Sequence, residues 1–316
     1  MTTSQSTPGR RRSFLTGLLG QGIKPSLTPE LHEREAERQR IRYVYKTVDL
    51  HDQQTTPDHL RQLLRFSIEL GFDGLNVTHP VKQAMVPLMD RVTPEAQAIG
   101  AINTVLIDDG LTIGHNTDAS GFGKAFREGL PDAKLDDVVL LGAGGAGTAV
   151  AHALVWLGVR RLRVVDPDTH RAKTLVDSTV TLASDTDVQW FAVADLPAAL
   201  EGTSGLVNAT PLGMADHPGT PVPADLLQPT LWVADIVYRP LVTELLRTAS
   251  ARGCRTLTGA GMAVHQAADA FELITGRPAH RRAMFRDFDD LVAAEVAETG
   301  HPAKPPAREP SRERNE

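Results

Sequence analysis

Residues 138–147 read VVLLGAGGAG, an apolar run that leads into three glycines spaced as G-x-G-x-x-G. The following ten residues have a helix-forming composition, and a second apolar run, 161–165, ends at Asp166. Strand, glycine-rich turn, helix, strand and acid, in this order, predict a βαβ unit that binds a dinucleotide. The alternative is an ordinary glycine-rich turn between a strand and a helix.

Each glycine of this turn has a physical task in such a unit. Gly142 permits the tight turn, Gly144 lets the backbone approach a pyrophosphate, and Gly147 lets the helix pack closely on the strand. The helix N-terminus adds unpaired N–H groups and the positive end of the helix dipole. We therefore expect the pyrophosphate on the loop of Gly142, Ala143, Gly144, Gly145, Ala146 and Gly147.

Apolar runs alternate with helical stretches from residue 138 onward. The predicted strands are 138–141, 161–165, 189–193, 205–208, 231–236 and 255–257. Six strands with helices between them are typical of a doubly wound parallel sheet. The fold class is therefore α/β, with a Rossmann-like dinucleotide domain that follows an N-terminal α/β domain.

Shorter elements precede this region. Predicted strands cover 14–19, 42–48 and 74–77, and the sequence DDG between 104–107 and 111–113 predicts a hairpin. Thr28 stands before Pro29 as a candidate N-cap, and Asp118 stands at the predicted start of another helix. Helices are also expected at 262–275 and 280–296.

The composition restricts the class of protein. The chain has 316 residues, which suits two domains, and 41% hydrophobic and 23% charged residues, as in ordinary globular proteins. Its net charge of −6 does not favour nucleic acid or an anionic membrane as a partner. The one cysteine, Cys254, excludes an intrachain disulfide, no Cys/His cluster has metal-ligand spacing, and no apolar run is long enough to span a membrane.

The N-terminal sequence RRRSFL, at 10–15, has features of a twin-arginine export signal. The apolar run after it is short and is broken by glycines, Lys24 and Pro25, whereas a signal needs a longer apolar segment. We therefore expect a first strand after a disordered tail, 1–12, a second disordered tail at 299–316, and a cytoplasmic protein.

Two stretches outside the nucleotide domain contain residues suited to catalysis. In NVTHPVK, 76–82, a strand end and a proline-fixed turn present Lys82, and in NTD, 116–118, a carboxylate stands at a helix start. Oxidation of an alcohol with a nicotinamide needs a base for the hydroxyl proton. A lysine paired with an aspartate can accept it. Taken alone, Lys82 reads as a surface lysine and Asp118 as a helix cap.

The ordered motifs of the chain resemble the shikimate dehydrogenase family over residues 14–295. They are Gly20 with SLTP at 26–29 and His32, GLNVTHPVK at 74–82, GAINT at 100–104, GHNTDASGF at 114–122, the glycine loop, NATPLGM at 208–214 and MAVHQA at 262–267. Together they are far more specific than any one of them.

The resemblance implies a role for each matching residue. Lys82 and Asp118 would be the catalytic pair, and Ser26 and Thr28 would bind the substrate carboxylate. The partners of the ring hydroxyls would be Thr78, Asn103 and Gln266, with Tyr238 at the border of the site. The residues at the nicotinamide end would be Thr210, Val237, Gly261 and Met262. No metal is implied.

Placing Gln266 in the site predicts that the chain crosses back to its first domain. We expect a substrate-binding catalytic domain at 13–119, completed by helices at 265–296, and an NAD-binding domain at 120–264. Closure of the cleft between them would exclude water from hydride transfer.

Asp166 predicts NAD as the cofactor, with NADP less favoured. Many family members have Asn-Arg-Thr at this place, whose arginine can pair with a 2′-phosphate, whereas this chain has DPDTHR at 166–171. Asp166 is placed to accept hydrogen bonds from the ribose hydroxyls and would repel a 2′-phosphate, as would Asp168. Arg171 leaves NADP open.

Thr28 is the second departure, because the biosynthetic enzymes of the family usually have Ser-x-Ser here. With Thr28 and Asp166, the chain resembles the NAD-dependent quinate/shikimate dehydrogenase branch. This resemblance implies a hydroxylated cyclohexane or cyclohexene carboxylate as substrate. The alternatives are a biosynthetic NADP-dependent shikimate dehydrogenase, a non-catalytic relative that kept the fold, and another Rossmann dehydrogenase such as a methylenetetrahydrofolate enzyme. The sequence leaves open a monomer or a homodimer.

Overall fold

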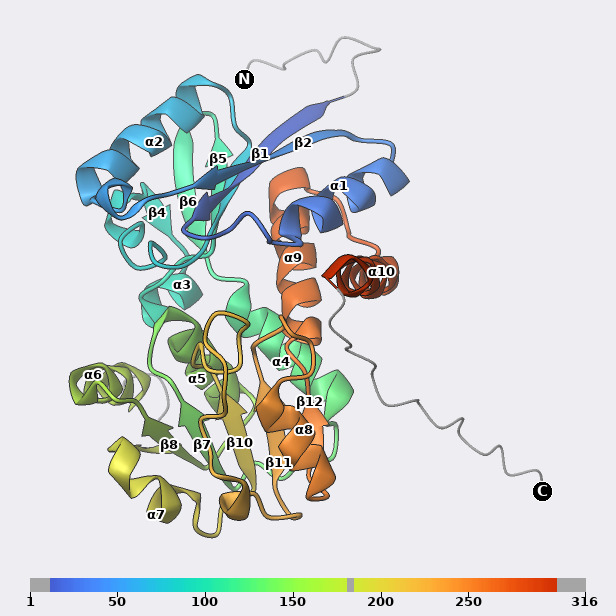
Figure 1. The fold of residues 1–316 in the computed structure, drawn as a ribbon. Coiled ribbons are helices and arrows are strands. Elements are labelled where there is room, and N and C mark those ends of the chain that lie inside the picture. The colour runs from blue at the N-terminus through green and yellow to red at the C-terminus, as the bar shows by residue number, and fades with distance from the viewer. Residues whose placement is uncertain (1–11, 181–184, 300–316) are drawn as a thin grey trace.

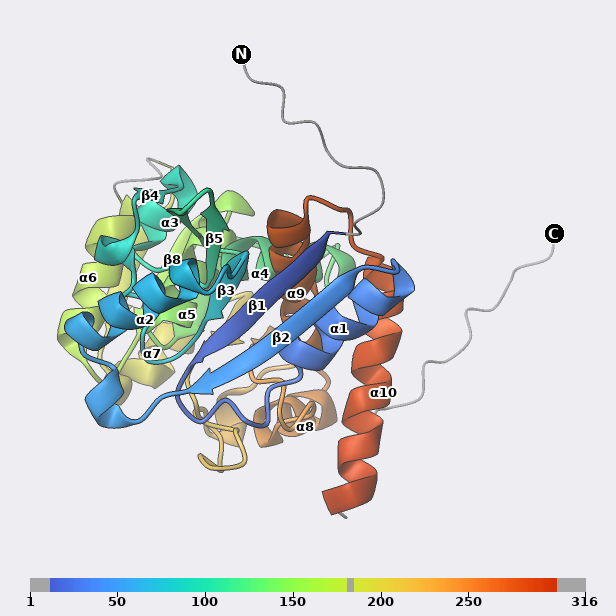
Figure 2. The ribbon, with the colours of Figure 1, turned by 90° about the horizontal axis from the view of Figure 1, so that it is seen from above.

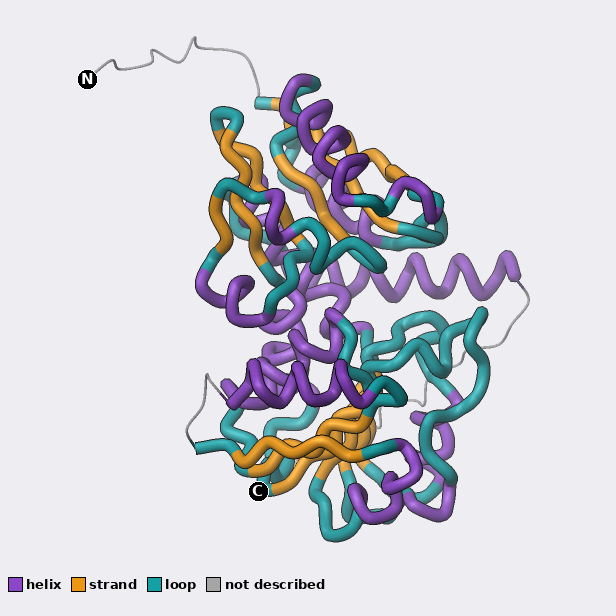
Figure 3. The backbone as a smooth tube through the Cα atoms, turned by 90° about the vertical axis from the view of Figure 1, so that its left-hand side faces the viewer, coloured by secondary structure: helices purple, strands orange, loops and turns teal. Residues whose placement is uncertain are grey.

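The structure, a computed structural model, describes residues 12–180 and 185–299. Within them the chain forms two six-stranded sheets, one above the other in Figure 1, with helices α4 and α9 running between them. The side view in Figure 3 shows the same two groups of strands with helices between them. In the described ranges no helix is long and apolar enough to cross a membrane.

The first sheet has the order β2-β1-β3-β5-β6-β4. Strand β1, second from the edge, is parallel to β2 and β3, whereas β5 is antiparallel to β3 and β6. β1 and β2 lie side by side in Figure 2. The strands are β1 (Ser13–Gly20), β2 (Arg42–Asp49), β3 (Gly74–Val77), β4 (Arg91–Val92), β5 (Thr104–Asp108) and β6 (Leu111–His115).

Helices cover this sheet with apolar side chains. The helices are α1 (Thr28–Arg38), α2 (Pro57–Glu69), α3 (Pro94–Ile99) and, from the C-terminal end of the chain, α9 (Ala260–Thr275) and α10 (Arg281–Thr299). Leu60 and Leu64 of α2 pack on strand residues such as Leu75. Leu31 of α1 packs with Val264 of α9 and Phe288 of α10.

The second sheet has the order β12-β11-β10-β7-β8-β9, with every pair parallel. Alternate residues of β7 face opposite cores: Val138 packs toward α5, and Val139 packs toward α7 and α8. A parallel sheet is stable when both faces are covered in this way. The elements are β7 (Asp137–Leu141), α5 (Gly145–Trp156), β8 (Arg161–Val165), α6 (Thr169–Val180), β9 (Asp187–Phe191), α7 (Leu196–Leu200), β10 (Gly205–Asn208), β11 (Trp232–Asp235), α8 (Glu244–Ala251) and β12 (Arg255–Leu257).

Helix α4 (Asp118–Gly129) leads from the first sheet to the second and packs closely on α9. A Cβ atom at Gly121 would lie 3.0 Å from both the backbone nitrogen of Gln266 and the carbonyl oxygen of Met262. Glycine at this position therefore lets the two helix backbones approach each other. The contact brings Gln266 beside the start of α4.

The predicted fold class, α/β with a Rossmann-like parallel sheet, is confirmed by the sheet order. All six strands predicted after residue 138 form, although β9 lies two residues earlier than expected. The role of Thr28 as N-cap is wrong: α1 begins at Thr28 itself, and its cap position, Leu27, makes no side-chain capping bond. The domain boundaries at 119–120 and 264–265 stay predictions.

The expected tails fall largely outside the described part of the chain. Residues 1–11 and 300–316 lie beyond it, and with them Arg10 and Arg11 of the export-signal sequence, whereas Ser13, Phe14 and Leu15 of that sequence belong to β1. Arg12 is exposed coil, and Thr299, counted with the C-terminal tail, still belongs to α10.

Candidate active site

Lys82 follows β3, one of the two middle strands of the first sheet. Its backbone carbonyl accepts a hydrogen bond from the N–H of Ile102, which fixes the turn after the strand. The Lys82 side chain is 16% exposed, and its Nζ lies 2.5 Å from Oδ2 of Asp118. Two residues that the sequence suggested as a pair therefore form a largely buried ion pair.

Asp118 is held at the first position of α4. The Asn116 side chain caps this helix, because its Oδ1 accepts hydrogen bonds from the N–H groups of Asp118 and Ala119. The N-terminus of a helix also favours a negative charge. With its side chain 7% exposed, Asp118 accepts a second hydrogen bond, 2.8 Å long, from Nδ2 of Asn103 at Oδ1. A buried charge of this kind needs such partners.

Asn103 lies beside the pair and is 3% exposed. Its Oδ1 accepts a 2.8 Å hydrogen bond from the N–H of Thr117, so its Nδ2 must face Asp118 and the Thr117 hydroxyl. The Thr117 hydroxyl in turn donates to the carbonyl of Gln266 in α9. The side chain expected to bind a ring hydroxyl is thus engaged with protein groups, and its contact with substrate stays a prediction.

Ser26 and Tyr238 meet although they lie far apart in the sequence. A side-chain hydrogen bond joins them, while burial raises the pKa of the Tyr238 hydroxyl. Oγ of Ser26 also accepts a 3.3 Å bond from the N–H of Thr28. The structure therefore gathers these three predicted substrate residues at one place, beside the start of α1.

Thr78 and Gln266 complete the predicted substrate group. Thr78 begins the turn that leads to Lys82, and its methyl group lies over Gly20, where an added Cβ would come within 2.4 Å. The Gln266 side chain donates to the carbonyl of Ala263 within α9. Both are partly exposed, which leaves them accessible to a ligand.

The glycine loop adopts the conformation that the motif predicts. Gly142 has a φ of 98°, and a Cβ at Gly147 would lie 2.0 Å from the carbonyl oxygen of Gly142, so both positions require glycine. Nothing lies within 4 Å of a Cβ placed at Gly144. The space beside Gly144 is therefore open, so a pyrophosphate could approach its backbone.

The loop also faces the catalytic candidates. A Cβ at Gly145 would lie 3.9 Å from carbons of Lys82 and 4.0 Å from Ala101. The first turn of α5 and the turn after β3 are thus neighbours, although they belong to different sheets. The glycine loop and Lys82 therefore border the same part of the molecule.

Asp166 directly follows β8 and is 6% exposed. One carboxylate oxygen accepts the N–H of Ala143 at 2.7 Å, and the other accepts the N–H of Asp168 at 2.8 Å. The acid therefore shapes the glycine loop, a role that the sequence did not suggest, and it is the hydrogen-bond partner of the Ala143 N–H. Each oxygen keeps a further lone pair for a ribose hydroxyl.

The four residues expected at the nicotinamide end lie where β10 and β11 end and α9 begins. Thr210 and Val237 follow the two strands, whereas Gly261 and Met262 pack toward α4, with Met262 8% exposed. Their contact with a nicotinamide stays a prediction.

Asp235 is a buried acid that the sequence reading missed. Oδ1 accepts from Nδ2 of Asn208 and from the N–H of Val237, and Oδ2 accepts from the hydroxyl of Thr243. Burial nevertheless raises its pKa to about 6. Asn208 also accepts the N–H and hydroxyl of Thr210, so this network fixes both loops beyond the strands. An acid at the end of an apolar strand, WVAD, was the available signal.

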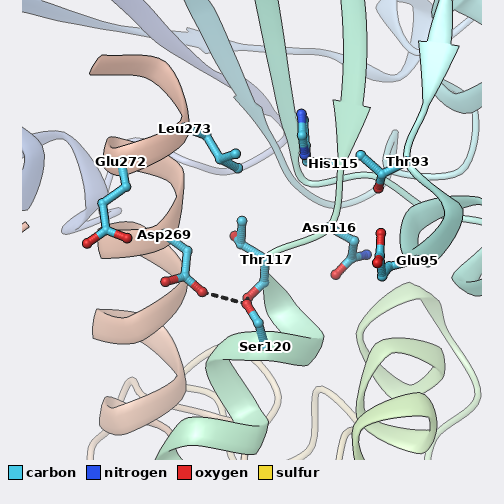
Figure 4. A pocket seen from close by; sticks show the side chains of 9 residues that line it. All are labelled: Thr93, Glu95, His115, Asn116, Thr117, Ser120, Asp269, Glu272 and Leu273. Carbon is cyan, nitrogen blue, oxygen red and sulfur yellow. Dashed lines mark hydrogen bonds between the residues drawn. The ribbon is translucent and has the colours of Figure 1, made fainter. Parts of the chain in front are cut away.

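A pocket of about 380 Å³ lies on α4 and α9, lined also by β6 and α3 residues (Figure 4). Thr117, which precedes α4, and Ser120 of α4 line it. A dashed line in Figure 4 joins the Ser120 hydroxyl to Asp269 of α9, 2.5 Å apart. Asp269 also pairs with Lys124 and Arg281. Of the acids that line the pocket, Asp269 and Glu272 are thus paired with cations of the protein.

A doubly wound parallel sheet with a G-x-G-x-x-G turn between a strand and the following helix defines the class of dinucleotide-binding proteins. Comparison with known proteins identifies a family within this class. Models for the shikimate dehydrogenase substrate binding domain and the shikimate 5′-dehydrogenase C-terminal domain match residues 18–105 and 259–284.

Two relatives of similar sequence identity have names that differ in substrate and cofactor. The chain is 52% identical to a shikimate dehydrogenase (NADP(+)) of Streptomyces avermitilis over 280 residues, 89% of this chain and 96% of the relative. It is 49% identical to a quinate/shikimate dehydrogenase (NAD(+)) of Corynebacterium glutamicum over 265 residues, 84% and 94% of the two chains.

Solved structures give the same result. A quinate dehydrogenase from Corynebacterium glutamicum in complex with NAD has a TM-score of 0.82 and 46% identity, and the match covers 88% of this chain and 99% of the other. A shikimate 5-dehydrogenase from Thermus thermophilus in complex with NADP(H) and shikimate has a TM-score of 0.76 and 33% identity, with coverage of 88% and 99%. The chain belongs to the shikimate dehydrogenase family, and it is an oxidoreductase that acts on a CH–OH group with NAD(P).

Proposed function

We propose that the chain is an NAD-dependent quinate/shikimate dehydrogenase. It would transfer a hydride reversibly between C3 of quinate or shikimate and the nicotinamide, giving 3-dehydroquinate or 3-dehydroshikimate. The observation that carries this proposal is the buried pair of Lys82 and Asp118 beside the glycine loop. The names of the relatives supply the substrate class.

The pair would handle the hydroxyl proton. When bound, the nicotinamide supplies the acceptor for the hydride that leaves C3. As the C–H bond breaks, the O–H bond of the same carbon breaks too, and its proton passes to the Lys82–Asp118 pair, which thus holds one proton more after the oxidation. In the reverse direction the pair returns that proton to the new alcohol.

The remaining site residues would orient the acid. The hydroxyls of Ser26 and Thr28 would donate to the substrate carboxylate, and Tyr238, already bonded to Ser26, would border it. Thr78, Asn103 and Gln266 would contact the ring hydroxyls. Correct placement of the C3 hydroxyl against the pair contributes to the rate because the reaction then needs little further ordering.

Asp166 supports NAD over NADP. A 2′-phosphate at about 4 Å from a carboxylate would cost about 4 kcal/mol at an effective dielectric of about 20, which is about a thousandfold in affinity. Asp168 adds a second negative charge, and Arg171, the cation that could offset it, is paired with Asp168 at 3.2 Å.

A biosynthetic NADP-dependent shikimate dehydrogenase is the second candidate. The Streptomyces avermitilis relative, 52% identical, bears that name. In that case Arg171, whose side chain is 64% exposed, would leave Asp168 and bind the 2′-phosphate. The two candidate functions share the catalytic pair and differ in whether the site binds a 2′-phosphate on the ribose.

A two-by-two steady-state assay at alkaline pH tests the proposal, since proton release then favours oxidation. Quinate and shikimate are each assayed with NAD and with NADP. We expect turnover of both acids with NAD. Activity confined to shikimate with NADP would establish the second candidate and overturn the role given to Asp166.

Three further expectations belong to this proposal. The enzyme would act in the cytoplasm, as a monomer or a homodimer, without nucleic acid, membrane or metal. Its substrate domain would comprise 13–119 and 265–296, and its NAD domain 120–264. Closure of these two parts would exclude water during hydride transfer.

A further inference from the structure

A line of buried polar side chains leads from β2 across the first sheet to the catalytic pair. The hydroxyl of Tyr45 lies 2.7 Å from Oδ1 of Asn76, and Nδ2 of Asn76 lies 3.2 Å from the hydroxyl of Thr104. That hydroxyl lies 3.0 Å from Oδ1 of Asn103, whose Nδ2 lies 2.8 Å from Oδ1 of Asp118. Four successive hydrogen bonds thus join Tyr45 to Asp118.

The direction of each bond follows from partners that can only donate or only accept. The N–H of Thr117 faces Oδ1 of Asn103, so the Asn103 nitrogen must face the Asp118 carboxylate. The carbonyl oxygen of Asn103 lies 3.5 Å from Nδ2 of Asn76, so the Asn76 oxygen must face Tyr45.

The hydroxyls are then fixed as well. Tyr45 can only donate to the Asn76 oxygen. Thr104 receives a hydrogen from Asn76, so its own single hydrogen goes to Asn103. Every donor in this line of hydrogen bonds therefore points toward Asp118. Successive hydrogen bonds that point the same way strengthen one another in a medium of low dielectric constant.

The four side chains of this line are buried, so bulk water does not compete for their hydrogen bonds. Tyr45 is 7% exposed, Asn76 4%, Asn103 3% and Thr104 0%. Burial also raises the pKa of the Tyr45 hydroxyl well above its ordinary value, so Tyr45 remains a donor. A buried polar side chain whose bonds are all satisfied has a defined rotamer.

We propose that Tyr45, Asn76 and Thr104 are positioning residues for the dehydrogenase reaction. Through Asn103 they hold the Asp118 carboxylate in the orientation that presents its second oxygen to Lys82. The inference rests on the proposed catalytic role of Lys82 and Asp118. It extends the machinery of the site to β2, at the edge of the sheet, whose residues the proposed reaction does not otherwise use.

Two isosteric variants interrupt the chain at different points. Tyr45→Phe removes the first donor, and Thr104→Val removes the hydroxyl in the middle. We expect kcat to fall about three- to tenfold in each, as for a lost hydrogen bond of about 1 kcal/mol that acts at the transition state. KM for NAD should stay unchanged, because the glycine loop is untouched. The double variant should lose no more than the larger single loss, since the chain is already interrupted.

Matched controls separate positioning from packing. Tyr43→Phe removes a hydroxyl from the same strand, two residues away, whose partner is His32 and not the chain to Asp118. It should keep the kcat of the wild type, and Thr104→Ser, which retains the hydroxyl, should recover it. Thermal unfolding of all variants shows whether each is folded under assay conditions.

The assays test the positioning role and the catalytic pair separately. Normal kcat in Tyr45→Phe and Thr104→Val, or equal losses in Tyr43→Phe, would overturn the positioning role. Parallel assays of Lys82→Ala and Asp118→Asn test the catalytic role of the pair independently. If these variants retain normal turnover, that proposed role is wrong. Loss in those two with normal turnover in Tyr45→Phe and Thr104→Val would overturn the inference alone.

Discussion

The Lys82 nitrogen and an Asp118 oxygen lie 2.5 Å apart, although the two residues are 36 positions apart in the chain. Lys82 follows β3, and Asp118 begins the helix that follows β6. Neither residue adjusts freely, since Lys82 is anchored through its carbonyl and Asp118 through the Asn116 cap. The pair is therefore a preformed feature of the first sheet.

Replacing Lys82 by alanine should abolish most of the turnover. The group that receives the hydroxyl proton is lost, and general acid–base groups contribute about 10²- to 10⁴-fold to rates. The Kd for NAD, measured by fluorescence titration, should barely change, because the glycine loop is intact. Near-normal kcat would remove Lys82 from the mechanism.

A comparable ion pair provides the control for this substitution. Lys124 pairs with Asp269 at 2.6 Å between α4 and α9, outside the proposed site. Lys124→Ala should retain the kcat of the wild type. Equal losses in both variants would indicate that removal of any such lysine disturbs the helix pair.

Replacing Asp166 by asparagine should narrow the preference for NAD. The substitution keeps an oxygen for the Ala143 N–H but removes the charge that opposes a 2′-phosphate. We expect the ratio of kcat/KM for NAD to that for NADP to fall about tenfold or more. Steady-state kinetics with both cofactors at fixed shikimate measure it.

The control for this variant is Asp132→Asn in the exposed loop before β7, at the opposite end of the sheet. It changes net charge by the same amount and should leave the cofactor ratio unchanged. An unchanged ratio in Asp166→Asn would show that the carboxylate serves the glycine loop alone.

Local patterns in the sequence were sufficient for the second sheet. Apolar runs of strand length and glycines at helix ends report backbone structure directly, and the glycine motif requires a positive φ at Gly142. Lys82 and Asp118 became candidates because each follows a recognisable element boundary. That they form a pair came from the family resemblance.

Other parts of the site could not be predicted, because they depend on strand register. Tyr45, Asn76 and Thr104 come from three strands, and only the order β2-β1-β3-β5 brings their side chains into one line. The second task of Asp166, binding the Ala143 N–H, likewise depends on how β8 lies against the loop. Sequence spacing does not contain such distances.

The buried Asp235 should make stability depend on pH. Burial raises its pKa from the ordinary 3.8 to about 6, against the opposing hydrogen bonds from Thr243, Val237 and Asn208. The folded protein thus binds this proton more tightly than the unfolded chain does. Its contribution to stability is present below pH 3.8 and is lost as pH rises through about 6.

Asp235→Asn removes this titration. At about 1.4 kcal/mol per pH unit, the stability of the variant relative to wild type should increase by about 2–3 kcal/mol between pH 4 and pH 7. Urea unfolding at several pH values measures the difference, with Asp132→Asn as the reference for a removed surface charge. A difference that does not vary with pH would contradict a raised pKa at Asp235.

The crossing of α4 and α9 provides a prediction with an internal control. A Cβ at Gly121 would lie 3.0 Å from backbone atoms of Met262 and Gln266, whereas nothing lies within 4 Å of a Cβ at Gly123 on the same helix. Gly121→Ala should therefore lower the free energy of unfolding by about 1–3 kcal/mol. Gly123→Ala should raise it by up to about 1 kcal/mol, because alanine favours the helix.

The two variants also differ in their expected effect on substrate. Displacement of α9 in Gly121→Ala would move Gln266, so KM for shikimate should rise while KM for NAD changes little. Gly123→Ala should leave both values unchanged. If Gly121→Ala loses stability but keeps its KM for shikimate, Gln266 does not contact the substrate. If both variants are equally stable, the helix backbones can separate without cost, and the close crossing does not position the site.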